Sequence, residues 1–232
     1  MKTRFVVRLV GVSVLSFLCQ LSNAQTDTTA TIATWNIEGF FRISDDRAAE
    51  IARGIVALDA EIIALQEINP DVAVQRIVAT ANSLGAQYAD PIILDQPANQ
   101  NLAIIFKTGV IVENPRFIDG SNLDVDSLRR ALVVDCEVGA FDFTMITVHL
   151  KSGRSNANRR TRTQQCVVIS DFIADVAAAG DDDVILLGDY NMIPGHCLNG
   201  IPRIIRTSDG SASDAEWRRG ESNPHLRDAT AP

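Results

Sequence analysis

Four apolar segments of strand length each lead directly into a polar residue that can bind a metal ion or a phosphate group. The clearest is the run Val-Ile-Leu-Leu at residues 184–187, which is followed by Gly188, Asp189, Tyr190 and Asn191. A short apolar run bounded by charge is typical of a buried strand. Asp189 and Asn191 are two residues apart, so on an extended segment their side chains face the same side. Taken alone, such a pair is equally typical of a turn that follows a strand.

The same arrangement occurs at three more places in the chain. Residues 31–35 lead to Asn36 and Glu38, residues 62–66 lead to Glu67, and residues 143–148 lead to His149. One polar residue at a strand end is a weak signal. Four of them in one chain indicate a shared site at the ends of neighbouring strands.

At these residues the sequence resembles the endonuclease/exonuclease/phosphatase family of metal-dependent phosphodiesterases, which includes the deoxyribonuclease I-like enzymes. Each matching motif is short, but the motifs occur in the order and at the spacing of the family across residues 30–195. The motifs are Thr34-Trp35-Asn36-Ile37-Glu38-Gly39, Leu65-Gln66-Glu67-Ile68, Thr147-Val148-His149-Leu150-Lys151-Ser152 and Gly188-Asp189-Tyr190-Asn191.

The resemblance implies an α/β (α+β) fold, a four-layer sandwich of two stacked mixed β-sheets flanked by helices. The residue patterns agree with strands at 30–36 and 61–66, helices at 46–58, 72–84 and 158–179, and a last clear strand at 184–187. Residues 101–106 and 110–112 look like a hairpin, and residues 131–138 and 142–150 like an antiparallel pair. We expect one domain over residues 25–206, and we expect its last strands to be missing.

The residues at the strand ends suit the hydrolysis of a phosphodiester. Such a reaction needs a cation that neutralises developing charge and groups that position water and phosphate. Hard oxygen ligands favour Mg²⁺, with Mn²⁺ as the other candidate. The resemblance assigns the metal-binding role to Asn36, Glu67 and Glu38, with Glu38 the weaker match. It assigns the catalytic role to the side chains of His149, Asp189 and Asn191.

A basic run follows His149 in a chain that is otherwise acidic. The formal net charge of the 232 residues is −8, so an enzyme that handles phosphate needs locally concentrated positive charge. We expect Lys151, Arg154 and Arg162 to bind the substrate phosphate. The alternative is a solvated loop and helix start, which is how most charged runs are used.

The N-terminus is typical of a secretory signal peptide over residues 1–24. Lys2, Arg4 and Arg8 precede a mostly apolar segment at 9–21, and Ser22-Asn23-Ala24 forms a small-x-small cleavage site. The apolar segment is too short to span a bilayer, although a retained anchor is the alternative. The prediction is a secreted or periplasmic protein. Export permits disulfides, but the three cysteines left after cleavage do not reveal a pairing.

The C-terminal end departs from the family pattern. The family ends in a strand with a Ser-Asp-His motif, and this sequence has none; His225 has no preceding Asp. Residues 207–232 contain no Val, Ile or Phe, so they cannot bury an apolar face. We expect a disordered tail or the product of a frame shift. The frame-shift reading is based on Gly220-Glu221-Ser222-Asn223-Pro224, which can be encoded by the complement of a transfer RNA T-arm.

The sequence therefore predicts an exported, Mg²⁺-dependent phosphodiester hydrolase, most simply nuclease-like, that acts as a monomer without stable membrane association. Nucleic acid is the favoured substrate, and small phosphodiesters and phospholipid head groups stay open. A chain that lacks the last strands would have little activity. The alternative function is a non-catalytic binding or scaffold protein on the same fold, which a test of metal-dependent hydrolysis would separate from an enzyme.

Overall fold

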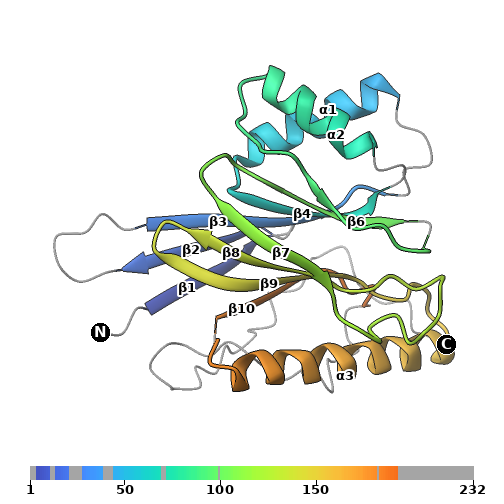
Figure 1. The fold of residues 1–232 in the computed structure, drawn as a ribbon. Coiled ribbons are helices and arrows are strands. Elements are labelled where there is room, and N and C mark those ends of the chain that lie inside the picture. The colour runs from blue at the N-terminus through green and yellow to red at the C-terminus, as the bar shows by residue number, and fades with distance from the viewer. Residues whose placement is uncertain are drawn as a thin grey trace, which may run out of the picture.

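Two β-sheets lie face to face between helices in the computed structural model, and the molecule has four layers (Figure 1). The structure describes residues 4–10, 14–20, 28–38, 44–68, 72–98, 100–181 and 183–192, with side chains from residue 30 onward. The predicted tail at 207–232 lies outside these residues. The stacked mixed sheets and flanking helices confirm the predicted fold class.

The first sheet has the strand order β1-β2-β3-β4-β6-β5. Its strands are β1 (Arg4–Val10), β2 (Val14–Gln20), β3 (Thr28–Asn36), β4 (Ile62–Ile68), β5 (Ile92–Ile93) and β6 (Asn101–Phe106). Only β3 and β4 run parallel within this sheet, and the other neighbouring strands are antiparallel. Both β1 and β2 fall inside the predicted signal peptide, which stays a prediction. Removal of residues 1–24 would take away both strands and leave the outer edge of β3 without a neighbour.

Side chains of β3 and β4 alternate between the two faces of the first sheet, as the period of a strand requires. Ile32, Ile62 and Ala64 face the second sheet, whereas Ile63 and Leu65 face the helices. Both faces are therefore apolar, which explains why the sequence shows continuous apolar runs here in place of an alternating pattern.

Helices α1 (Asp45–Leu58) and α2 (Val72–Ser83) cover the outer face of the first sheet. Ser44 caps α1, since its side chain accepts a hydrogen bond from the backbone N–H of Arg47 at 3.3 Å. The chain leaves α2 through Gly85, whose φ of 101° suits a residue without a Cβ atom. Both helices match their predictions to within two residues.

The second sheet has the order β10-β9-β8-β7. It contains β7 (Ile111–Phe117), β8 (Leu132–Val138), β9 (Phe141–His149) and β10 (Val184–Asp189). The antiparallel pair β8–β9 was predicted and is confirmed, and β10 runs parallel to β9. Helix α3 (Asn156–Ala178) covers the outer face of this sheet, where Val133, Ile146 and Ile169 belong to one apolar cluster.

The predicted hairpin of residues 101–106 and 110–112 is wrong. The first segment is β6 and pairs with β4 and β5, whereas the second begins β7 and pairs with β8 in the other sheet. The turn at 107–110 carries the chain from one sheet to the other. Pro115 and the irregular register between Glu113 and Arg116 are typical of an edge strand, which agrees with the mostly exposed side chains of β7.

The central core lies between the two sheets. Ile62 and Ile104 of the first sheet and Val134, Met145 and Leu187 of the second belong to one buried cluster. This packing fixes the strand ends of the two sheets relative to one another.

Cys136 and Cys166 are buried in separate clusters, and they form no disulfide with each other. Cys197 lies outside the described residues. Among the helices that the structure describes, none combines the length and the apolar character that a membrane span requires.

Candidate active site

Four of the predicted residues meet at one end of the sandwich. Asn36 ends β3, Glu67 is the next-to-last residue of β4, His149 ends β9 and Asp189 ends β10. Within each sheet the two strands concerned are parallel neighbours, and in the second sheet Asp189 lies beside His149 in the register. Parallel strands end at the same edge of a sheet, so each sheet contributes two polar groups to a common place.

The backbone around Glu67 aims its side chain toward that place. The register of β4 against β6 shifts between Leu65 and Ile68, and Glu67 has a φ of 66°. Left-handed backbone is uncommon for a residue other than glycine and occurs at strand irregularities that redirect a side chain. Here the irregularity separates Glu67 from the regular alternation of the strand.

Gly188 brings β10 close to β9 immediately before Asp189. Its φ is 135°, and a Cβ atom at this position would collide with the backbone of Val148. Only glycine satisfies both conditions. This close approach sets Asp189 against His149, which accounts for the glycine in the sequence Gly188-Asp189-Tyr190-Asn191.

The polar groups form a compact cluster. The amide nitrogen Nδ2 of Asn36 donates to Glu67 Oε1 at 3.0 Å and to Asp189 Oδ2 at 2.8 Å, and so links the two sheets. Nε2 of His149 lies 3.7 Å from each of the same two oxygen atoms. One ligand atom from each of Glu67, His149 and Asp189 lies within 4.8 Å of the others. These three residues could hold a metal ion together.

The donor set fits a divalent cation. Two carboxylates that both face a ring nitrogen would repel each other without a positive charge between them. Mg²⁺ or Mn²⁺ prefers the carboxylate oxygens of Glu67 and Asp189, and an imidazole nitrogen is a better ligand for Mn²⁺ than for Mg²⁺. The structure thus groups Glu67 with His149 and Asp189 as possible ligands, and Asn36, which the sequence assigned to the metal site, contacts the same two carboxylates.

His149 is held in its neutral form. The side chain is buried, and burial, followed by the nearby Arg129 charge, lowers the pKa of His149 to about 4, against the opposing effect of Asp189 and Glu67. Its Nδ1 atom is buried and finds no hydrogen-bond partner among the residues that the structure describes. A neutral imidazole at pH 7 has one lone pair for a metal ion or one N–H for a phosphate oxygen.

The remaining predicted ligands lie around the cluster. The side chain of Asn191 donates to the carbonyl of Leu150 at 3.0 Å, and its backbone N–H donates to Asp189 Oδ1 at 2.8 Å. Asn191 therefore holds Asp189 in place from the following turn. Glu38 is exposed, and its backbone N–H donates to Asn36 Oδ1 at 2.9 Å. No metal-binding contact of the Glu38 carboxylate is seen within the described residues.

The three predicted phosphate-binding residues differ in their surroundings. Arg154 is exposed, and Lys151 is partly buried directly after β9. Arg162 is buried, and its Nη1 atom donates to the carbonyls of Lys151 at 2.7 Å and Gly153 at 2.9 Å. The structure shows Arg162 holding the loop that follows His149; its contact with phosphate stays a prediction.

Two further side chains reach the cluster that the sequence did not single out. Gln100 donates to Glu67 Oε2 at 3.1 Å, and Arg129 donates to Gln100 Oε1 at 3.5 Å. Burial lowers the pKa of Arg129 below its usual value, and the carboxylates of Glu67 and Asp189 only partly oppose this effect. Neither residue belongs to a polar strand end of the kind that marked the others, so the strand-end pattern could not reveal them.

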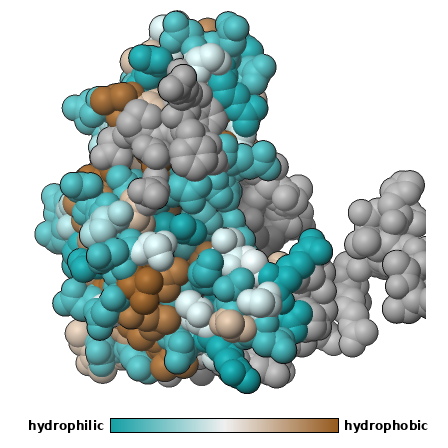
Figure 2. Space-filling model, turned by 90° about the vertical axis from the view of Figure 1, so that its right-hand side faces the viewer, coloured by the Kyte–Doolittle hydropathy of each residue, from teal (hydrophilic) through white to brown (hydrophobic). Residues whose placement is uncertain are grey.

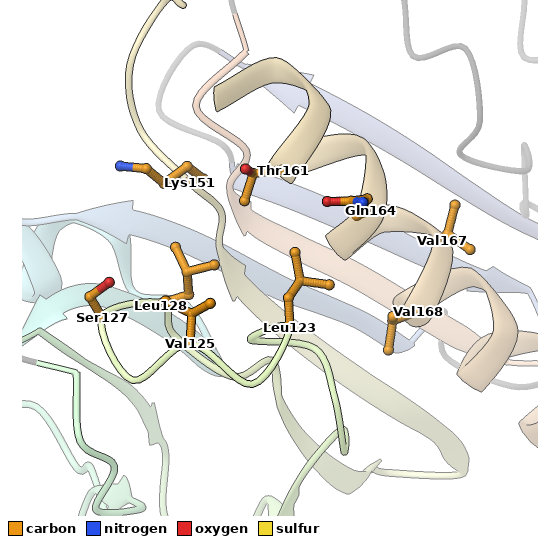
Figure 3. A pocket seen from close by; sticks show the side chains of 9 residues that line it. All are labelled: Leu123, Val125, Ser127, Leu128, Lys151, Thr161, Gln164, Val167 and Val168. Carbon is orange, nitrogen blue, oxygen red and sulfur yellow. The ribbon is translucent and has the colours of Figure 1, made fainter. Parts of the chain in front are cut away.

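An aliphatic cleft lies beside the basic loop, between α3 and the turns at 118–128 (Figure 3). Its volume is about 710 Å³, within the range of small-molecule sites. Apolar side chains also gather in the lower part of the face shown in Figure 2. The cleft contains Lys151 but none of the clustered residues, so it adjoins the site without forming it. The lining residues are Leu123, Val125, Ser127, Leu128, Lys151, Thr161, Gln164, Val167 and Val168.

The two-sheet sandwich brings a cluster of carboxylates and a histidine together at its strand ends, an arrangement that suits a metal-dependent hydrolase. A model of the Endonuclease/Exonuclease/phosphatase family matches residues 33–224, and the chain belongs to that family. The family comprises phosphodiesterase- and nuclease-type hydrolases that depend on divalent metal ions. The matched range includes part of the segment 207–232 that was predicted to lie outside the domain.

Solved structures show the same fold. Truncated TDP2 from Caenorhabditis elegans matches at 20% identity and a TM-score of 0.56, over 70% of this chain and 62% of that one. TDP2 from D. rerio, complexed with a single-strand DNA product, matches at 19% identity and 0.54, over 71% and 61%. The human Nocturnin catalytic domain with bound sulfate matches at 19% and 0.56, over 71% and 66%.

The chain thus spans less than two thirds of the length of the nematode structure. No curated protein sequence matches this chain.

Proposed function

We propose that this protein is an exported, Mg²⁺-dependent phosphodiesterase that cleaves nucleic acid. The observation that carries the proposal is the cluster in which Glu67, His149 and Asp189 place three potential ligand atoms within 4.8 Å of one another, in a chain of this family. Mg²⁺ would act as a Lewis acid that neutralises the developing charge on the phosphate oxygens. The carboxylates of Glu67 and Asp189 would hold it.

The protein's own groups divide the remaining work. Asn36 keeps the two carboxylates together through its bonds to Glu67 and Asp189. The pKa of His149 is lowered to about 4, so its imidazole is neutral at pH 7. The neutral ring can donate one hydrogen bond to a phosphate oxygen, but it has no second proton to transfer. Asp189 is fixed by Asn191 and by Asn36, which suits it to orient the attacking water.

Nucleic acid is the proposed substrate for two reasons. The structurally similar D. rerio protein was solved with a single-strand DNA product. Lys151 and the exposed Arg154 lie just beyond His149, where a charged backbone could extend from the site. The acidic net charge of the whole chain limits binding to surfaces other than this loop.

The test is hydrolysis of a labelled single-stranded DNA oligonucleotide by the purified full chain, with Mg²⁺, with Mn²⁺ and with EDTA. We expect cleavage that requires a divalent cation and is lost in Glu67→Gln, a variant of nearly the same shape. Metal binding without cleavage of DNA or of a small activated phosphodiester would overturn the enzymatic function and favour the binding protein.

Export is tested separately by expression of the full gene product in a bacterial host. A mature N-terminus at Gln25 in the periplasm or medium supports the signal peptide. An intact N-terminus on a cell-associated protein contradicts it.

A further inference from the structure

Arg129 is a partly buried cation with few partners. It lies in the loop that leads into β8, and one hydrogen bond of 3.5 Å to Gln100 Oε1 is its only polar contact within the described part of the chain. Its Nε atom is buried without a partner there. A guanidinium group has five N–H donors, and leaving them unpaired in a buried place costs free energy. Within the described residues, the protein alone thus leaves hydrogen-bond donors of Arg129 unpaired.

The charge of Arg129 is directed at the cluster. Gln100 connects it to Glu67, since the same amide group accepts from Arg129 and donates to Glu67 Oε2 at 3.1 Å. The carboxylates of Glu67 and Asp189 act on Arg129, and the Arg129 charge in turn acts on His149. Arg129 is therefore linked to Glu67 through Gln100, and its charge acts on the other two residues that could bind the metal ion.

The formal charges of the site favour an anionic ligand once a metal ion is bound. Glu67 and Asp189 contribute two negative charges, and Arg129 contributes one positive charge. A divalent cation would change the net charge of these three groups from one negative to one positive. A phosphodiester carries one negative charge, so the loaded site would attract it.

This inference rests on the proposed function. We propose that Arg129 binds a non-bridging oxygen of the scissile phosphate and that Gln100 positions it. A planar guanidinium fork is well suited to two phosphate oxygens, and such charge-assisted bonds are about twice as strong as neutral ones.

The adjacent Arg130 provides a matched control. It is the same residue type at the next position, but its guanidinium lies 5.9 Å from the centre of the Phe117 ring, and its backbone N–H donates to Gln96 Oε1 at 2.8 Å. No contact between Arg130 and the cluster is found in the described residues. Arg130→Gln therefore removes an equal charge nearby without removing the proposed phosphate contact.

The experiment measures binding of two ligands to the Mg²⁺-loaded full chain. One is the dinucleotide TpT, and the other is its methylphosphonate analogue, which has nearly the same shape but no charge at the phosphorus centre. We expect Arg129→Gln to weaken TpT binding about tenfold or more and to change binding of the neutral analogue by less than about twofold. Arg130→Gln should alter neither affinity. An equal loss for both ligands in Arg129→Gln would overturn the proposal.

A second variant covers the case in which Arg129→Gln does not fold. Gln100→Ala keeps the charge of Arg129 but removes its anchor, so it should weaken TpT several-fold and spare the analogue. An unchanged ratio of the two affinities in Gln100→Ala would contradict the positioning role.

The role of Arg129 and the proposed function fail in different ways. If the wild-type chain cleaves DNA with Mg²⁺ but Arg129→Gln binds TpT as tightly as the wild-type chain does, the role of Arg129 is wrong and the hydrolase stands. If the wild-type chain binds TpT no better than its neutral analogue and cleaves neither, the proposed function has failed.

Discussion

Arg162 and Arg129 are both removed from full solvent exposure near the same site, yet their surroundings are opposite. Arg162 donates to two backbone carbonyls, those of Lys151 and Gly153, and is held by them. Arg129 has one long hydrogen bond and a buried Nε atom without a partner among the described residues. The first guanidinium is satisfied by the protein fold, whereas the second is left to be satisfied by something else.

The difference shows that a position within a basic run does not tell what a guanidinium contacts. Arg162 belongs to the basic run after His149 and was expected at the phosphate, but its donors stabilise the loop. Arg129 comes from a loop 20 residues before His149 in the sequence and faces the carboxylates. Unsatisfied donors beside a cluster of opposite charge are a better sign of a ligand site than charge density in the sequence.

The largest effect is expected at Glu67, the carboxylate that Gln100 connects to Arg129. Glu67→Gln keeps the shape but removes one charge from the metal site, and we expect activity and Mg²⁺ affinity to fall by about 100-fold or more, since even outer partners of metal sites contribute 10- to 100-fold. Titration of Mg²⁺ by calorimetry, together with the rate of DNA cleavage, measures both quantities. Full activity in this variant would contradict the difference drawn between Arg129 and Arg162, because Arg129 would then lie beside no functional metal site.

The next effect is the pH dependence of stability through His149. Its pKa is about 4 in the folded protein and close to 6.5 in the unfolded chain, so between these values the unfolded state binds more protons. In metal-free protein, the stability present above pH 6.5 is therefore lost as the pH falls toward 4, by about 3 kcal/mol at most. Urea denaturation in EDTA between pH 4.5 and 7.5 measures the loss.

Three variants identify the source of that pH dependence. His149→Gln should remove much of it. Because the Arg129 charge is the second cause of the lowered pKa of His149, Arg129→Gln should reduce the pH dependence, whereas Arg162→Ala should leave it unchanged. A dependence that is equally strong in His149→Gln would assign it to other groups.

A smaller loss of folding stability is expected from Arg162→Ala. This change removes hydrogen bonds from a charged donor to two carbonyls and leaves the carbonyl of Lys151 without that partner, at a cost of about 2 kcal/mol. Chemical denaturation at pH 7 gives the value, with Arg160→Ala, an exposed neighbour on the same helix, as the control. If stability were unchanged while phosphate binding was lost, Arg162 would bind the ligand, as proposed for Arg129, and would not stabilise the loop.

Most of the fold could be predicted because local patterns determine it. The apolar runs of β3 and β4 and the Ser44 cap of α1 are visible in the sequence. The pairing of β6 with β7 was predicted wrongly because two neighbouring strands with a short turn give the same local signal whether they share a sheet or change sheets. The choice depends on the distant partners β4 and β8.

The site was predictable where residues sit at strand ends, and not where they approach from loops. Asn36, Glu67, His149 and Asp189 follow apolar runs, and the structure brings them together. Gln100 reaches Glu67 because β6 pairs with the distant strand β4, and Arg129 reaches Gln100 because the two sheets stack. No short-range pattern records either contact. The distance of a residue from a motif in sequence was therefore a poor guide to its distance from the site.

The smallest effect is expected from Arg154→Ala. Arg154 is exposed, unlike Arg162 and Arg129, and so extends the comparison to an arginine on the surface. Because of this exposure, the free energy of unfolding should change by less than about 0.5 kcal/mol. If it meets the nucleic-acid backbone beyond the cleaved bond, its loss should weaken binding of a long oligonucleotide, reduce the salt dependence by roughly one counterion, and leave TpT binding unchanged. Fluorescence anisotropy across a series of salt concentrations measures this. A loss of TpT affinity as large as that in Arg129→Gln would mean that the exposed loop, and not the half-buried guanidinium, recognises the phosphate.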